Sequence, residues 1–192
     1  MQLELCNIEG LYFCKEFLEE ERANSIAKEL LSHAKDWRGV SNCPTSRRVL
    51  QFGKMYAYAG EVPQFAHPIP LEFQEIADAV SRTLPFEHAA FSQLIVNEYT
   101  PGQGISSHID NVHHFGDTVA CITVGGGAEV EFSREGFETH RLYADHGSLY
   151  VMTGDARFKW KHGIAMRKTD TRDGDILARE LRYSLTFRSV LS

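Results

Sequence analysis

The chain lacks the features that mark membrane, secreted and DNA-coating proteins. Its 192 residues contain no apolar run long enough to cross a bilayer, so no membrane partner is expected. The start, MQLELCNIEGLYF, has no basic segment followed by an apolar one, which argues against a secretory signal. The formal net charge of −6 excludes a strongly basic protein that coats DNA, although it is compatible with a local basic groove. We therefore expect a soluble intracellular monomer, cytoplasmic or nuclear.

Patterned cysteines are also absent. Cys6, Cys14, Cys43 and Cys121 form no C-x-x-C pair, which argues against a zinc knuckle or a redox motif. Without a secretory signal they are expected to be reduced thiols. Hydrophobic residues make up 43% of the chain and charged residues 24%, as in ordinary globular proteins, and the length suits one domain over residues 1–192.

Two helices are predicted in the first 90 residues. Apolar residues recur at helical spacing over residues 17–36 and again over residues 71–84, where prolines stand at both ends. The segment between them, NCPTSRRVLQFGKMYAYAGEVPQFAHPIP, is rich in aromatic residues, glycine and proline, and predicts a hairpin or an ordered loop that covers the substrate. The predicted buried faces consist of Ala23, Ile26, Ala27, Leu30, Leu31 and Ala34 in the first helix and of Phe73, Ile76, Ala77, Val80 and Leu84 in the second.

The character of the sequence changes after Pro85. The runs SQLIVNEY, TVACITV, AEVEF, GSLYVMTG and RYSLTFRSV are typical of short strands, and turns such as Pro101-Gly102 separate several of them. Strands at this spacing predict a sandwich or jelly roll. The predicted fold is therefore α+β with a mainly β core over residues 91–192, and the helices of residues 1–90 cover the outside of one sheet.

His108, Asp110 and His162 form a candidate metal site. Side chains two apart in a strand point to the same face, so His108 and Asp110 can chelate one ion from one strand end. His162, in KWKHGI, would arrive from a later strand and complete the two-histidine, one-carboxylate set that holds non-heme Fe(II), with positions left open for a cosubstrate and O2. The competing interpretation is a loop pair without a metal. Other histidines rank lower as ligands because none has a carboxylate two residues away on a strand-like segment: His113, His114, His140 and His146.

The segment RYSLTFR predicts a site for an anion. Polar and apolar residues alternate from Arg182 to Arg188, so one face of this strand is polar and the other apolar. Arginines on the interior side of a half-buried strand need an anionic partner, and planar guanidinium groups suit a dicarboxylate such as 2-oxoglutarate. Asn97 and Tyr99, in VNEY, can add an amide and a phenol to the same ligand. The alternative is an edge strand whose arginines face solvent.

Taken together, NEYTPGQGISSHID, SLYVMTGDARFKWKHGI and RYSLTFR resemble the AlkB family of Fe(II)- and 2-oxoglutarate-dependent dioxygenases. The resemblance extends over GLYFCKEFLEEE and RRVLQFGKMYAY and covers most of the chain. It implies a double-stranded β-helix core and an enzyme that oxidises alkyl groups on nucleobases, although some branches act on tRNA wobble uridines or on proteins. The residues that it implies are His108, Asp110 and His162 for Fe(II), and Asn97, Tyr99, Arg182, Ser184 and Arg188 for 2-oxoglutarate.

Two positions differ from the DNA-repair branch of this family. Ser184 stands where the repair enzymes carry Asn, and Val112 stands where they carry an acidic residue that contacts the exocyclic amine of the damaged base. Valine cannot accept that hydrogen bond, so a methylated adenine or cytosine would be read differently. The segments HHFGD and MTGDARFKWKHGI are closer to the branch that hydroxylates modified wobble uridines in tRNA.

These features predict a dioxygenase that oxidatively demethylates or hydroxylates a modified nucleobase in RNA, tRNA or single-stranded DNA. A protein-modifying oxygenase, similar to a methyl-lysine demethylase, is the alternative that the net charge and Val112 favour. A catalytically silent RNA-binding module is a third, against which the metal and arginine sets argue. Arg47 and Arg48 are predicted to contact phosphates of the substrate, and Phe52, Tyr56 and Tyr58 to stack on an extruded base. A basic rim near His162 is predicted from Arg157, Lys159, Lys161, Arg167 and Lys168. The competing interpretation is that these aromatic side chains pack beneath the loop and these charges face solvent.

Overall fold

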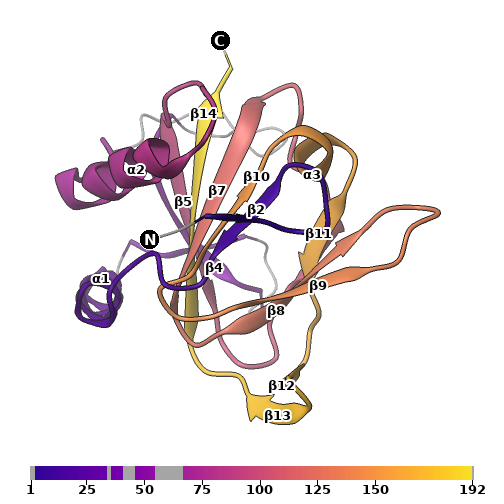
Figure 1. The fold of residues 1–192 in the computed structure, drawn as a ribbon. Coiled ribbons are helices and arrows are strands. Elements are labelled where there is room, and N and C mark those ends of the chain that lie inside the picture. Colours follow the sequence, from indigo (N-terminus) through magenta and orange to yellow (C-terminus); the bar gives the residue numbers. More distant parts are fainter. Residues whose placement is uncertain (1–2, 34–35, 41–45, 55–66, 192) are drawn as a thin grey trace.

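Two antiparallel sheets and a layer of two helices build the molecule, which we describe from a computed structural model covering residues 3–33, 36–40, 46–54 and 67–191. The large sheet has the order β1-β2-β10-β7-β14-β5-β4-β3, and the small sheet has the order β6-β11-β8-β9 (Figure 1). The large sheet consists of β1 (Glu4–Leu5), β2 (Leu11–Cys14), β10 (Leu149–Met152), β7 (Phe115–Gly125), β14 (Arg182–Val190), β5 (Gln93–Tyr99), β4 (Arg48–Gly53) and β3 (Arg38–Gly39).

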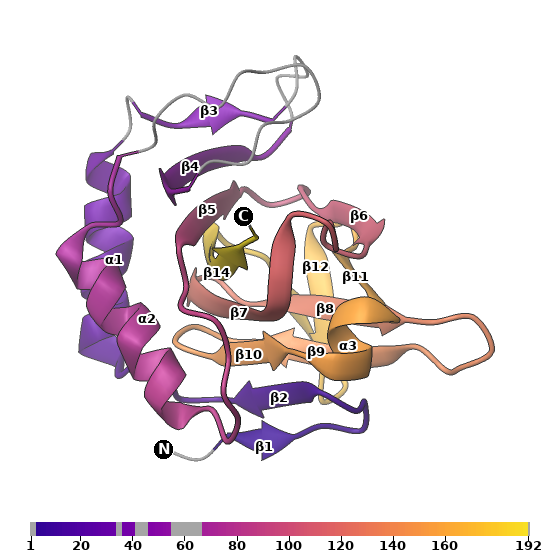
Figure 2. The ribbon, with the colours of Figure 1, turned by 90° about the horizontal axis from the view of Figure 1, so that it is seen from above.

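The small sheet lies against one face of the large sheet, and the helices cover the other (Figure 2). It consists of β6 (Ile105–His108), β11 (Lys161–Ile164), β8 (Ala128–Ser133) and β9 (His140–Ala144). A separate hairpin is formed by β12 (Thr169–Arg172) and β13 (Asp175–Ala178). The predicted mainly β jelly roll with helices outside one sheet is confirmed. The large sheet also takes β1 to β4 from the first 90 residues.

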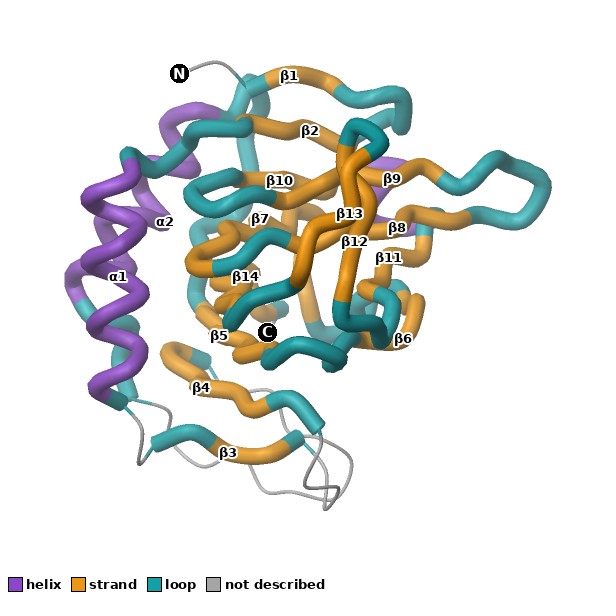
Figure 3. The backbone as a smooth tube through the Cα atoms, turned by 90° about the horizontal axis from the view of Figure 1, so that it is seen from below, coloured by secondary structure: helices purple, strands orange, loops and turns teal. Residues whose placement is uncertain are grey.

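The long helices α1 (Glu20–Ser32) and α2 (Leu71–Thr83) lie side by side on one side of the strands (Figure 3). The guanidinium of Arg22 on α1 lies 3.0 Å from the carboxylate of Glu72 on α2. Both predicted helices are confirmed, and α2 buries Phe73, Ile76, Ala77 and Val80 as expected. Leu31 was expected on the buried face of α1, and this is wrong: it is 56% exposed, because one residue turns the helix by about 100° from the buried Leu30. Ala34 lies outside the described residues.

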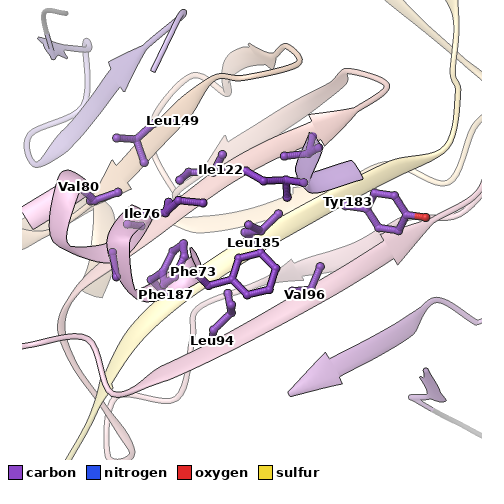
Figure 4. Packing of buried hydrophobic residues seen from close by; sticks show 14 of the residues in the cluster. Phe73, Ile76, Val80, Leu94, Val96, Ile122, Leu149, Tyr183, Leu185 and Phe187 are labelled. Carbon is purple, nitrogen blue, oxygen red and sulfur yellow. The ribbon is translucent and has the colours of Figure 1, made fainter. Parts of the chain in front are cut away.

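The helices pack on the apolar face of β14 and its neighbours. Phe73, Ile76 and Val80 of α2 meet Leu185 and Phe187 of β14 in a continuous apolar cluster (Figure 4). Side chains of this size contribute about 1.5–3 kcal/mol each when they are fully buried. β14 pairs with β5 on one side and with β7 on the other, so it is an interior strand of the large sheet. The face of β14 that points away from the helices looks toward the small sheet.

None of the helices in the described ranges has the length and the apolar composition needed to span a bilayer.

Candidate metal and cosubstrate site

A cavity of about 960 Å³ opens at one end of the two facing sheets. Its floor comes from the polar face of β14 and from β5, and its side comes from β6 and β11 of the small sheet. The lining includes most of the residues that the sequence singled out: Arg47, Asn97, Tyr99, His108, Asp110, Val112, His162, Ser184 and Arg188.

His108, Asp110 and His162 come together in this cavity. His108 ends β6, Asp110 follows two residues later, and His162 lies directly across from His108 in the antiparallel pairing of β6 with β11. The two imidazole ring centres are 4.5 Å apart, and one possible ligand atom from each of the three residues lies within 4.8 Å of the others. Within the described ranges, no second group of histidine, cysteine and acidic residues has this geometry. The three side chains therefore fit a metal ion.

The hydrogen bond of His108 leaves one of its ring nitrogens free for a metal. Its Nδ1 lies 2.8 Å from the carbonyl oxygen of Ser106. A carbonyl only accepts, so Nδ1 carries the proton and Nε2 keeps its lone pair. A metal-binding imidazole is typically oriented by such a hydrogen bond, donated by the ring nitrogen that does not bind the metal.

The protonation states of the other two residues also suit a cation. Burial raises the pKa of the Asp110 carboxyl, but the guanidinium of Arg188 outweighs burial and holds that pKa well below its usual range. Arg188 Nε lies 3.0 Å from Oδ2 of Asp110. Burial lowers the pKa of His162 to about 4, so its imidazole is neutral at pH 7. An ionised carboxylate and neutral imidazoles are the forms that bind metals.

A glycine keeps the two histidine-bearing strands close. Gly163 follows His162, and a Cβ at that position would come within 2.9 Å of the backbone of Ser107 on β6. Real Cβ atoms essentially never come so close to main-chain atoms, so a side chain here would push β11 away from β6. The HG pair in KHGI thus combines a ligand with the space that its strand needs.

Arg182 is a buried cation with unused hydrogen-bond donors. It is 2% exposed, its Nη2 donates to Thr123 Oγ1 at 2.9 Å, and its guanidinium lies 5.5 Å from the ring centre of Tyr99. Its Nε and Nη1 are buried and have no partner among the described residues. A buried charge in this state is costly unless an anion approaches it, so the position fits one end of a dicarboxylate.

The other residues predicted for 2-oxoglutarate lie beside Arg182 on the same face. In the pairing of β14 with β5, Tyr99 lies across from Arg182 and Asn97 lies across from Ser184. Burial raises the pKa of the Tyr99 phenol, which therefore stays neutral. Asn97, Tyr99 and Ser184 thus offer an amide, a phenol and a hydroxyl to the cavity, and the cation of Arg182 lies next to Tyr99. This set fits a bound keto-dicarboxylate.

Only one of the two adjacent arginines predicted for substrate lines the cavity. Arg47 does, and its Nε donates to Asn97 Oδ1 at 3.0 Å. Arg48 lies on the helix side of β4, where it binds Glu98 through hydrogen bonds of 2.7 and 2.9 Å. Phe52, on the same side, is 7% exposed and packs against Phe73. The prediction that Arg48 and Phe52 contact substrate in the cavity is wrong, because side chains alternate along β4. Tyr56 and Tyr58 lie outside the described residues.

The basic rim expected near His162 is also wrong for its main members. Arg157 is 2% exposed, Lys159 lies 2.7 Å from Asp155, and Arg167 binds Glu129 and Asp170. Their charges are buried or neutralised within the protein.

The apolar mouth of the cavity was not predicted from the sequence. Among the cavity-lining residues, Val112, Phe158 and Met166 are 40%, 42% and 71% exposed. Of these, only Val112 stood out in the sequence, and only as a missing acid. Phe158 stands between Arg157 and Lys159, and Met166 stands between Ala165 and Arg167. No local pattern tells them from ordinary surface residues.

Residues 10–188 match the 2OG-Fe(II) oxygenase superfamily. The ALKBH8 protein of Mus musculus, a tRNA (carboxymethyluridine(34)-5-O)-methyltransferase by name, is 32% identical over 89% of this chain, which spans 30% of that relative. The chain belongs to the AlkB family of 2OG-Fe(II) oxygenases. As an AlkB-family enzyme it is a dioxygenase that uses Fe(II), 2-oxoglutarate and O2.

Two further similarities extend over nearly the whole AlkB-family domain. The uncharacterized protein L905 of Acanthamoeba polyphaga mimivirus is 29% identical, over 96% of this chain and 87% of that protein. The solved structure of OsALKBH1 superposes with a TM-score of 0.69 at 17% identity, over 97% of this chain and 99% of that one. At that identity the superposition supports the jelly-roll fold alone.

Proposed function

We propose that this AlkB-family dioxygenase hydroxylates or oxidatively demethylates a modified nucleobase in RNA, tRNA or single-stranded DNA. The observation that carries the proposal is the clustering of His108, Asp110 and His162 in a cavity that Asn97, Tyr99 and Ser184 also line, with buried Arg182 across from Tyr99 and two of its donors unused. The ALKBH8 relative, whose name gives a tRNA uridine as its target, supports a nucleic-acid substrate. The single-domain organisation over residues 1–192 and a monomeric state are part of the same proposal.

In this proposal His108, Asp110 and His162 hold Fe(II). Arg182, Arg188, Tyr99, Asn97 and Ser184 bind 2-oxoglutarate. When both are bound, they would let O2 act as the oxidant: one oxygen atom would be inserted into a C–H bond of the substrate, and the other would end in succinate as 2-oxoglutarate loses CO2. Hydroxylation of an N-methyl group then releases formaldehyde, whereas hydroxylation at carbon leaves a stable alcohol.

The protein's own side chains orient the ligands and exclude water. Arg188 holds the Asp110 carboxylate ionised and fixes its orientation at 3.0 Å. Val112, Phe158 and Met166 give the mouth an apolar border, which favours the flat face of an extruded base and removes water from the reacting carbon. Arg47 is the described cation at this mouth.

The apolar mouth and the internally paired charges also favour a second candidate, an oxygenase that acts on methyl-lysine in a protein. Basic residues near His162 are neutralised by Asp155, Glu129 and Asp170. The charges of Lys159 and Arg167 are therefore not available to a phosphate backbone. A methylated side chain needs only an apolar entrance of modest width.

One turnover screen tests both candidates. The protein is incubated with Fe(II), ascorbate and 2-oxoglutarate together with methylated DNA, methylated RNA, tRNA or histone-type peptides, and succinate and product mass are measured. We expect succinate coupled to an oxidised base in a single-stranded substrate and none from the His108→Ala variant. Coupling only to peptides would replace the first candidate by the second. Absence of coupled turnover with every substrate would refute both.

A further inference from the structure

Arg157 is a buried arginine that no carboxylate neutralises. It lies in α3 (Gly154–Phe158), is 2% exposed, and is among the largest fully buried side chains of the described residues. Burial lowers the pKa of its guanidinium. Within the described ranges none of the ion pairs includes Arg157, although the other buried arginine outside the cavity, Arg179, binds Asp170 at 2.7 Å. An arginine buried at this cost needs a specific reason to be there.

The guanidinium of Arg157 binds main-chain carbonyls of one short segment. Its Nη1 donates to Asp110 O at 2.9 Å and its Nε donates to Gly116 O at 3.1 Å. Its Nη2 donates to Phe115 O at 3.3 Å and to Asn111 O at 3.4 Å. The planar, rigid set of five N–H groups on arginine can hold several carbonyls at fixed spacing, which the single ammonium group of lysine cannot do.

This segment, residues 110–116, begins with the acidic ligand itself. It turns back through a hydrogen bond from Phe115 N to Asn111 O at 3.1 Å and then enters β7. Asp110 therefore lies at one end of a turn in which the first two and the last two carbonyls accept hydrogen bonds from one side chain. The orientation of its carboxylate depends on the position of that turn.

Arg157 also lies on the segment that carries the third ligand. His162 follows it by five positions, and only two residues lie between α3 and β11. The same side chain thus joins the main chain of Asp110 to the element that delivers His162. No other described residue makes side-chain hydrogen bonds from the α3–β11 segment to the main chain of Asp110.

We propose that Arg157 is a positioning residue for the metal centre: by holding residues 110–116 against α3, it fixes the Asp110 carboxylate relative to the two histidines. The inference rests on the proposed role of His108, Asp110 and His162 as metal ligands. It predicts that the site is assembled before metal arrives and loses affinity when the guanidinium is replaced.

The test is a titration of the full chain with Co(II) alone, followed by its visible absorption bands, for the Arg157→Lys variant. Replacing groups that orient metal ligands typically costs about 10–100-fold in metal affinity, so we expect the Kd for Co(II) to rise at least about tenfold. The bands should also change, because a displaced Asp110 alters the geometry around the ion.

Arg179→Lys is the matched control. Arg179 is likewise buried, and it likewise donates to main-chain carbonyls, those of Gln103 and Ala165, but it contacts none of the three ligands. We expect this variant to unfold at lower urea concentration and to keep the Co(II) affinity and bands of the parent. Equal affinity in Arg157→Lys and the parent, or equal loss in both variants, would overturn the proposal.

The variants Asp110→Asn and His162→Ala distinguish the proposed role of Arg157 from the underlying proposal that His108, Asp110 and His162 bind the metal. If both abolish Co(II) binding while Arg157→Lys does not, the metal site stands and the role of Arg157 fails. If neither affects Co(II) binding, the metal site itself fails.

Hydrogen exchange decides the matter if Arg157→Lys does not fold. In the metal-free parent protein, the amide of Phe115 should exchange as slowly as the amides of neighbouring β7. Fast exchange of residues 110–116 that slows only when Co(II) is added would show that the metal, and not Arg157, orders the segment.

Discussion

The two faces of β14 place opposite demands on one strand. Toward the helices, Leu185 and Phe187 are fully buried among apolar side chains. Toward the small sheet, Arg182 is equally buried but keeps two donors without partners. Alternation of side chains lets one backbone serve both purposes. The helix side of β14 therefore stabilises the fold, whereas the cavity side keeps hydrogen-bond donors without protein partners that are available to a ligand.

Loss of a ligand on the cavity side should have the largest effect. We expect His162→Ala to reduce succinate formation at least about 1000-fold, a cost on the order of 4 kcal/mol in the transition state, because iron is no longer held. His140→Ala, on β9 and outside the ligand group, should keep full turnover. Comparable rates in both variants would remove His162 from the site.

On the helix side, Leu185→Ala should act on stability instead. A fully buried leucine cut to alanine costs about 2–5 kcal/mol, measured as the free energy of unfolding in urea. The KM for 2-oxoglutarate should not change in the fraction that remains folded. Leu191→Ala, where the leucine is 49% exposed, is the control and should cost little. A large loss of cosubstrate affinity in Leu185→Ala would break the division between the two faces.

Arg182→Met tests whether the cavity face of β14 serves cosubstrate binding and not stability. Removing the guanidinium should raise the KM for 2-oxoglutarate about 100-fold, since a buried charged pair is worth a few kcal/mol to its partner. Because Nε and Nη1 are unpartnered without the ligand, the urea midpoint of the ligand-free protein should stay the same or rise. Arg48→Met, on the helix side, should show the reverse: a lower midpoint, since Glu98 loses its partner, and an unchanged KM.

The smallest expected effect is the contribution of Asp170 to the pH dependence of stability. Burial raises the pKa of Asp170, but hydrogen bonds from Arg179 and Arg167 outweigh burial and lower it overall. A lowered folded-state pKa means that Asp170 stabilises the protein above its unfolded pKa of about 3.9 and loses that effect as the pH falls through the folded value. The stability difference between the parent and Asp170→Asn, from urea unfolding, should therefore be constant near pH 6–7 and shrink below about pH 4. A difference that is independent of pH would contradict this.

Strands with a buried apolar face could be predicted from the sequence. Strands whose extended form depends on pairing with neighbouring strands could not. β5, β7 and β14 contain runs such as LIV and ACITV that mark them locally. β6 (ISSH) and β11 (KHGI) have no such run, because each contains a single isoleucine among serine, lysine, histidine and glycine. Their extended form comes from pairing with each other and with β8.

The same distinction explains the candidate site. The cluster of His108, Asp110 and His162 was predictable because the chemistry of a metal constrains the residue types and the spacing of a site that could hold it. The environments of Arg48 and Arg157 were not. Which of two adjacent arginines faces a cavity depends on the phase of β4, and the burial of Arg157 depends on carbonyls more than 40 residues earlier in the chain.

The cross-strand pairing of His162 with His108 constrains how this sequence can change in length over generations. One residue inserted into or deleted from β11 would turn His162 to the other face and bring Lys161 or Gly163 opposite His108. The tips of two hairpins are free of this constraint, since a Cβ at Gly136 or Gly174 would meet nothing within 4 Å. Insertions and deletions among descendants should therefore collect at the β8–β9 and β12–β13 tips, and the spacing around β6 and β11 should be inherited unchanged.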